Sequence, residues 1–144
     1  TMSPFLYAEQ ITGALLMYGV FDMSYYRAPD GYIKLLGFTK RFVRSFVSKD
    51  RVGEGDAFDR ASPIFYAHKD VCPAFFVHGQ KDNLVPYAQS VLFHDELKRL
   101  GVQTEFVTVP YGHAYDFFQR NTRAVVFGQM LAFLDTHLKA KSGS

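Results

Sequence analysis

The sequence of 144 residues has no tryptophan and one cysteine, and its charges nearly cancel. A single cysteine, Cys72, excludes a disulfide within the chain. The formal net charge of +2 is too small to predict binding to nucleic acid. No apolar run approaches the roughly 18 residues of a membrane-spanning helix. The first ten residues also lack the basic start and apolar stretch of a secretory signal. We therefore expect a soluble, cytoplasmic protein without a membrane span.

Histidine and cysteine are too scattered to predict a metal centre. His68, His94 and His137 stand far apart, with no pair at ligand spacing and no cysteine cluster beside them. The sequence therefore predicts no metal and no other cofactor.

Three apolar segments are typical of buried parallel strands, whose two faces are both covered by helices. Helical patterns alternate with these segments, so each passage from strand to strand implies a right-handed crossover. The predicted strands span 11–20, 74–77 and 103–109. We expect one α/β unit over residues 1–144, a three-layer α/β/α arrangement of about three parallel strands with crossover helices.

Two helices after the central strand have recognisable signals. Pro86 fits the first turn of a helix, where its missing N–H costs nothing. Lys98, Arg99 and Gly101 form the C-terminal signature of the same helix. A closing helix over 121–138 is predicted to gather apolar residues on one face, formed by Ala124, Phe127, Leu131, Leu134 and Leu138.

The segment 25–62 interrupts this alternation and has the size of a lid. It combines a turn-rich aromatic start, an amphipathic helix over 33–47 and a polar, glycine-bearing loop. An ordinary crossover helix with a long return loop is the alternative. The first strand would leave a sheet edge exposed. That edge predicts pairing with an N-terminal half, with another chain, or with a second copy in a homo-oligomer.

Two polar residues follow neighbouring predicted strands. Asp82 comes after the strand in PAFFVHGQKDNLVP, and His113 comes after the strand in EFVTVPYGH. Open α/β sheets keep their functional groups at the carboxyl ends of strands, and adjacent strands lie only ~4.8 Å apart. We therefore predict that Asp82 orients His113, which serves as a general base toward a nucleophile.

Structural interpretations stand beside this one. Asp82 could cap the helix that begins near Pro86, and His113 could be a turn residue bonded to the backbone. His78 is expected to tie the loop together through a hydrogen bond. Asp116 is expected to cap a helix, with seating of the His113 loop as the alternative. Four aromatic residues near the base either line an acyl pocket or belong to the core: Tyr111, Tyr115, Phe117 and Phe118.

The stretches around Asp82 and His113 resemble a known family. Ser62-Pro63, then PAFFVHGQKDNLVPYAQS with a helix ending in LKRLG, then VPYGHAYDFF are similar to the C-terminal half of α/β-hydrolase-fold esterases and lipases. The hormone-sensitive-lipase-like group looks nearest, with prolyl-oligopeptidase-type peptidases further off. The resemblance extends over about residues 11–138 and includes YGVFD at the first strand end. It implies that Asp82 is the acid and His113 the base of a catalytic triad.

The nucleophile of that family has no counterpart in the sequence. Neither a G-x-S-x-G elbow nor an HGGG-type oxyanion loop occurs, and both would precede the first predicted strand. Ser3, Ser24, Ser62 and Ser90 lack the context of an elbow, and Cys72 stands at the wrong end of its strand. We therefore expect the chain to begin shortly after the elbow and to be nearly inert by itself.

Two functional hypotheses follow from these residues. The first is a carboxylic-ester hydrolase fragment, of the esterase or lipase kind, that acts on small apolar esters once the nucleophile half is supplied. The second is a catalytically inactive remnant or interaction module that pairs through its sheet edge. Turnover of a p-nitrophenyl ester distinguishes the two.

Overall fold

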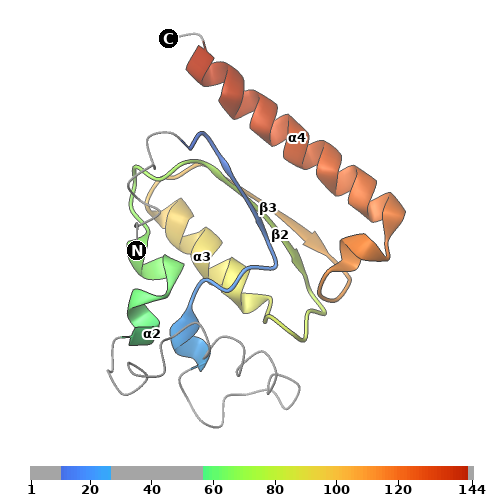
Figure 1. Ribbon diagram of the computed structural model, residues 1–144. Helices are drawn as coiled ribbons and strands as arrows, with labels where there is room; N and C mark the ends of the chain where they lie inside the picture. The colour runs from blue at the N-terminus through green and yellow to red at the C-terminus, as the bar shows by residue number, and fades with distance from the viewer. Residues whose placement is uncertain (1–10, 27–56, 143–144) are drawn as a thin grey trace.

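The structure, a computed structural model, describes residues 11–26 and 57–142 (Figure 1). Its centre is a three-stranded sheet in the order β1-β2-β3, formed by Ala14–Met17, Ala74–Gly79 and Thr104–Val109. Both pairings are parallel, and Phe76 of β2 lies opposite Leu16 of β1 and Phe106 of β3. The predicted three parallel strands are confirmed, and β1 forms one edge of the sheet as expected.

Side chains that alternate along β2 divide the core between the two faces of the sheet. Phe75 and Val77 pack in one cluster with helix α4 (Arg120–Ser142). Phe76 packs on the opposite face with helix α3 (Ala88–Arg99). Figure 1 shows the sheet between these two helices. All residues of β2 are buried, as a strand covered on both faces requires.

The structure moves several predicted boundaries. β1 is shorter than the predicted strand over 11–20, because Tyr18 adopts a φ of 49° that ends the extended conformation. β2 continues beyond its predicted end to Gly79. Helix α3 begins after Pro86, at Ala88, because turns precede it; the Gln89 N–H donates to the Pro86 carbonyl oxygen at 2.9 Å.

The predicted C-terminal signature of α3 is confirmed. Gly101 has a φ of 81°, in the left-handed region that glycine tolerates. Its N–H donates to the Lys98 carbonyl oxygen, and the N–H of Val102 donates to the Leu97 carbonyl oxygen, each at 3.0 Å. These bonds satisfy carbonyl groups that the end of a helix would otherwise leave unpaired.

The predicted apolar face of the closing helix is largely wrong. Val126, Met130 and Phe133 of α4 are buried, whereas Leu131 is 67% exposed and Leu138 is 54% exposed. Apolar residues occur around most of this helix, so their spacing does not select one face. Packing against Phe75 and Val77 determines which face is buried. Of the residues predicted to form the apolar face, Leu134 packs against this cluster.

Buried polar side chains anchor the chain where it leaves β1. Gln89 Oε1 accepts hydrogen bonds from the N–H groups of Phe21 at 2.9 Å and Asp22 at 2.7 Å. Gln89 Nε2 donates to the Asp22 carbonyl oxygen at 3.1 Å. Short helical turns follow in the described part of the connection to β2: η2 (Met23–Tyr26), α2 (Ala57–Arg60) and η5 (Pro63–Tyr66). The predicted helix over 33–47, and most of the lid-like segment 25–62, lie outside the described residues.

Candidate active site

The loops after β2 and β3 approach each other closely at Gly79. The Gln80 N–H donates to the Val109 carbonyl oxygen at 2.8 Å, and the Lys81 N–H donates to the Tyr111 carbonyl oxygen at 3.0 Å. A Cβ atom at Gly79 would overlap the Tyr111 carbonyl oxygen. A residue without a side chain is therefore required where the two loops meet.

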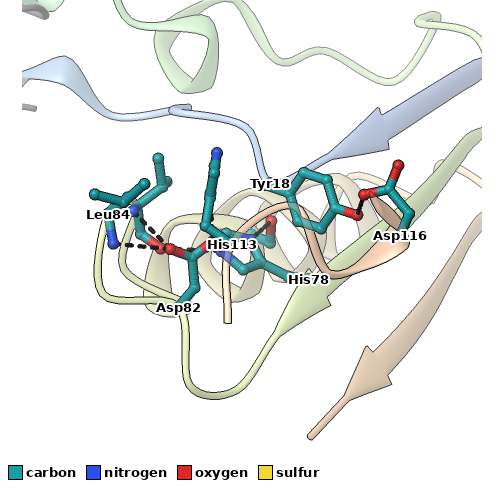
Figure 2. Close-up of polar contacts among 8 residues, drawn as sticks. Tyr18, His78, Asp82, Leu84, His113 and Asp116 are labelled. Carbon is teal, nitrogen blue, oxygen red and sulfur yellow. Dashed lines mark hydrogen bonds and ion pairs between the residues drawn. The ribbon is translucent and has the colours of Figure 1, made fainter. Parts of the chain in front are cut away.

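This contact brings Asp82 and His113 together. His113 Nδ1 lies 2.7 Å from Asp82 Oδ2, at hydrogen-bond distance, and the Asp82 side chain is fully buried while that of His113 is 29% exposed (Figure 2). Asp82 Oδ1 accepts hydrogen bonds from the N–H groups of Leu84 and Val85, each at 2.9 Å. One carboxylate oxygen thus accepts hydrogen bonds from the backbone of its own turn, and the other contacts the imidazole.

Four hydrogen-bond donors set the electrostatics of Asp82. Burial disfavours the charged carboxylate and raises its pKa, but hydrogen bonds from His78, Val85, His113 and Leu84 outweigh that effect. The pKa of Asp82 is therefore held below its usual value, so the group is a carboxylate at neutral pH. A carboxylate on Nδ1 fixes the tautomer of His113 and leaves Nε2 to accept a proton.

The lowered pKa of Asp82 predicts a loss of stability in acid. Because its pKa is lower in the folded chain than in the unfolded chain, where it is about 3.9, Asp82 contributes fully to stability above the unfolded pKa. This contribution disappears as the pH falls through the folded pKa. Urea unfolding at neutral pH and near pH 3 is expected to show a smaller pH dependence for Asp82→Asn than for the original sequence. The exposed Asp95 provides the control Asp95→Asn; an equal pH dependence in all three proteins would contradict the prediction.

Tyr18 and Asp116 form a second contact beside His113. The Tyr18 hydroxyl donates to Asp116 Oδ1, and its ring centroid lies 5.1 Å from that of His113 (Figure 2). Burial, reinforced by Asp116, raises the pKa of Tyr18, so the hydroxyl stays protonated as a donor. Ala114, directly after His113, has a φ of 54°, as Tyr18 has a φ of 49°. Strained backbone at residues next to the imidazole is typical of functional sites.

The expectation that Asp116 caps a helix is wrong, and the alternative that it seats the His113 loop is confirmed. The residue before helix η6 (Tyr115–Phe117) is Ala114, and it makes no side-chain capping bond. Asp116 lies inside this short helix and receives the Tyr18 hydroxyl from the end of β1. The sequence gives Tyr18 no role of its own, and its signal there is its place in YGVFD at the end of the first predicted strand.

The nearby aromatic residues divide between core and surface. Tyr111 packs against the cluster that contains the buried Tyr115, and their rings stack with centroids 5.9 Å apart. Phe118 is 80% exposed, and the side chain of Phe117 lies outside the described part of the chain. The core interpretation holds for Tyr115, which has no surface left for a substrate.

The hydroxyl groups of Ser24, Ser62 and Ser90 are already engaged. Ser62 and Ser90 are fully buried; Ser62 Oγ donates to the Phe58 carbonyl oxygen, and Ser90 Oγ lies 2.6 Å from His78 Nδ1. Ser24 Oγ donates to its neighbour Asp22. Ser3 lies outside the described residues. Burial removes Ser62 and Ser90 as nucleophiles.

Within residues 11–26 and 57–142, no three His, Cys, Asp or Glu side chains gather as the ligands of a metal ion would. Over the same residues, no helix combines the length and apolar character that crossing a bilayer requires.

The fold and the paired residues define a class of protein. A parallel sheet between layers of helices, with Asp and then His at the ends of successive strands, is the arrangement of the α/β-hydrolases. The model of the prolyl oligopeptidase family matches residues 9–141, and the chain belongs to this family. The α/β-hydrolase fold predicted from the sequence is confirmed. The matching prolyl oligopeptidase family is the one that the sequence motifs resembled more distantly than the hormone-sensitive-lipase-like group.

Similar proteins include esterases and a peptidase. Esterase LipQ of Mycobacterium tuberculosis is 34% identical over 108 residues, which cover 74% of this chain and 24% of the relative. Probable carboxylic ester hydrolase LipM of the same organism is 30% identical over 110 residues, with the same coverage. Acylaminoacyl peptidase of Pyrococcus horikoshii superposes with a TM-score of 0.72 at 21% identity, over 90% of this chain and 20% of the peptidase. The chain thus spans about a quarter of the length of these curated relatives.

Proposed function

We propose that Asp82 and His113 are the acid and the base of a serine hydrolase that cleaves carboxylic esters, and that the nucleophilic serine lies outside these 144 residues. The observation that carries the proposal is the 2.7 Å contact from His113 Nδ1 to a fully buried Asp82 carboxylate. The names of the two mycobacterial relatives support an ester as the substrate. The engaged hydroxyl groups of Ser24, Ser62 and Ser90 support a nucleophile from elsewhere.

In this mechanism the imidazole transfers one proton in each half of the reaction. His113 Nε2 accepts the proton of the serine hydroxyl while the serine oxygen attacks the ester carbonyl carbon and a tetrahedral intermediate forms. The imidazolium then gives the proton to the departing alkoxide, which leaves as an alcohol, and an acyl-enzyme remains. Water, deprotonated by His113, releases the carboxylic acid and restores the serine. Asp82 stabilises the imidazolium in both halves of the reaction without being protonated.

The edge strand β1 is the proposed place of attachment for the nucleophile half. β1 pairs with β2 on one side, and its other side is a sheet edge. An apolar pocket of about 330 Å³ lies beside it, lined by residues that include Leu16, Phe93 and Leu97. An N-terminal half that adds a strand to β1 and covers this pocket would satisfy the exposed backbone groups. The alternative, a catalytically inactive module, uses the same edge to bind a second copy of the chain.

Hydrolysis of p-nitrophenyl butyrate tests the proposal. We expect no turnover from the 144-residue chain by itself, and turnover from a protein that joins it to a segment with a G-x-S-x-G elbow. The variant His113→Ala of that longer protein is expected to lose turnover. Activity that survives His113→Ala would refute the assignment. Gel filtration of the 144-residue chain tests the alternative of an inactive module that pairs with a second copy. That alternative predicts a dimer, and a monomer would contradict it.

A further inference from the structure

His78 is a second histidine beside the proposed triad acid. It lies near the end of β2 and is fully buried. Its Nε2 is 3.0 Å from the Val85 carbonyl oxygen and 3.2 Å from Asp82 Oδ2, and its Nδ1 is 2.6 Å from Ser90 Oγ. Both ring nitrogens therefore have polar partners inside the protein (Figure 2).

These partners fix the proton positions and the orientation of the ring. A carbonyl oxygen can only accept a hydrogen bond, so the Nε2 that faces Val85 carries hydrogen. In the neutral ring, Nδ1 then accepts the hydroxyl hydrogen of Ser90. The rings of Tyr18 and Tyr87 pack edge-on against His78, with centroids 6.2 Å and 5.8 Å away. The ring is thus held by hydrogen bonds and by packing in a single orientation.

We propose that His78 is a positioning residue for the triad acid: its Nε2–H, shared between the Val85 carbonyl oxygen and Asp82 Oδ2, holds the carboxylate in the orientation that receives His113. The inference rests on the proposed function of Asp82 and His113. The contacts form a closed ring: Asp82 Oδ1 accepts the Val85 N–H, the Val85 carbonyl accepts His78 Nε2–H, and the same nitrogen faces Asp82 Oδ2. The turn cannot rotate the carboxylate away from His113 without breaking a member of this ring.

The charges around Asp82 agree with this role. Among the described residues, the titratable groups that act on the carboxylate are His78 on β2, His113 after β3 and Tyr26 on η2, whose own pKa is raised by burial and further by Tyr25 and Asp82. The His78 contact is the largest of the influences that lower the pKa of Asp82. An N–H donor in this place compensates the charge of a buried carboxylate.

Two substitutions of similar polarity separate positioning from packing. The amide nitrogen of Gln in His78→Gln reaches the place of Nε2. That of Asn in His78→Asn reaches the place of Nδ1, which removes the donor that residue 78 provides to Asp82 Oδ2. We would record the downfield proton resonance of His113 Nδ1–H and the pH midpoint of the Asp82 carboxyl carbon by NMR of the full chain. His78→Gln is expected to keep both signals. His78→Asn is expected to lose the resonance and to move the midpoint to higher pH.

The outcomes decide the proposal in either direction. Equal losses in the two variants, or unchanged signals in a folded His78→Asn, would overturn it. If His78→Asn does not fold, Ser90→Ala takes its place: freeing Nδ1 is expected to broaden the His113 resonance, and a sharp, unshifted resonance would overturn the proposal. These readouts need no nucleophile. Failure of the ester assay would therefore count against the proposed function and leave the His78 result standing.

Discussion

Replacement of Asp82 by asparagine is expected to lower kcat for ester hydrolysis about 10⁴-fold in the protein that includes the nucleophile half. The buried carboxylate that now accepts from His113 Nδ1 becomes an amide whose NH₂ group can face the imidazole. His113 would then place its proton on Nε2 and could no longer accept the proton of a serine. The steady-state rate with p-nitrophenyl butyrate measures the loss, and an unchanged KM would show that binding of the ester survives.

Asp116→Asn is the matched control, because Asp116 is the other carboxylate close to His113 along the chain. Its Oδ1 accepts the Tyr18 hydroxyl hydrogen, and the amide oxygen of asparagine can accept the same bond. We therefore expect a small change in kcat. A loss for Asp116→Asn as large as that for Asp82→Asn would show that the carboxylate which orients the base has been assigned wrongly.

The pairing of Asp82 with His113 could be predicted from the sequence because its determinants are local. Each residue follows an apolar strand within a few positions, and each loop contains a glycine that marks the end of that strand. Parallel neighbours end at the same edge of the sheet, so two such loops must lie side by side. The alternation of strands and helices also predicted parallel neighbours with the first strand at an edge, which is confirmed, whereas the register of the strands comes from the structure alone.

Contacts between residues far apart in the sequence, and the choice of the buried face of α4, could not be predicted in the same way. Tyr18 and Asp116 are 98 positions apart, and neither lies in a pattern that specifies the other. His78 was expected to bond the loop, which is confirmed, but its second approach to Asp82 Oδ2 depends on the turn geometry at Val85. The face of α4 was misassigned because apolar residues surround that helix, and the choice is made by the strand it covers.

Gly79→Ala is expected to have the largest effect of any substitution outside the pair itself. The new Cβ would overlap the Tyr111 carbonyl oxygen and lie 2.8 Å from the Gly112 carbonyl oxygen. Both atoms belong to the backbone, so the loop that carries His113 must move as a whole. We expect the free energy of unfolding to fall by about 3 kcal/mol. A displacement of about 1 Å at the base is also expected to lower kcat about 10²-fold.

Gly128→Ala is the matched control for this substitution. Gly128 lies within α4, and beyond the adjacent backbone of that helix a Cβ atom there would meet nothing within 4 Å. In an exposed helix interior, alanine has a helix propensity about 1 kcal/mol more favourable than that of glycine. This variant is therefore expected to be somewhat more stable than the original chain. Urea unfolding measures both variants, and the His113 Nδ1–H resonance reports the site directly. If Gly79→Ala kept that resonance and its stability, the two loops would not depend on their contact at Gly79 to bring Asp82 and His113 together.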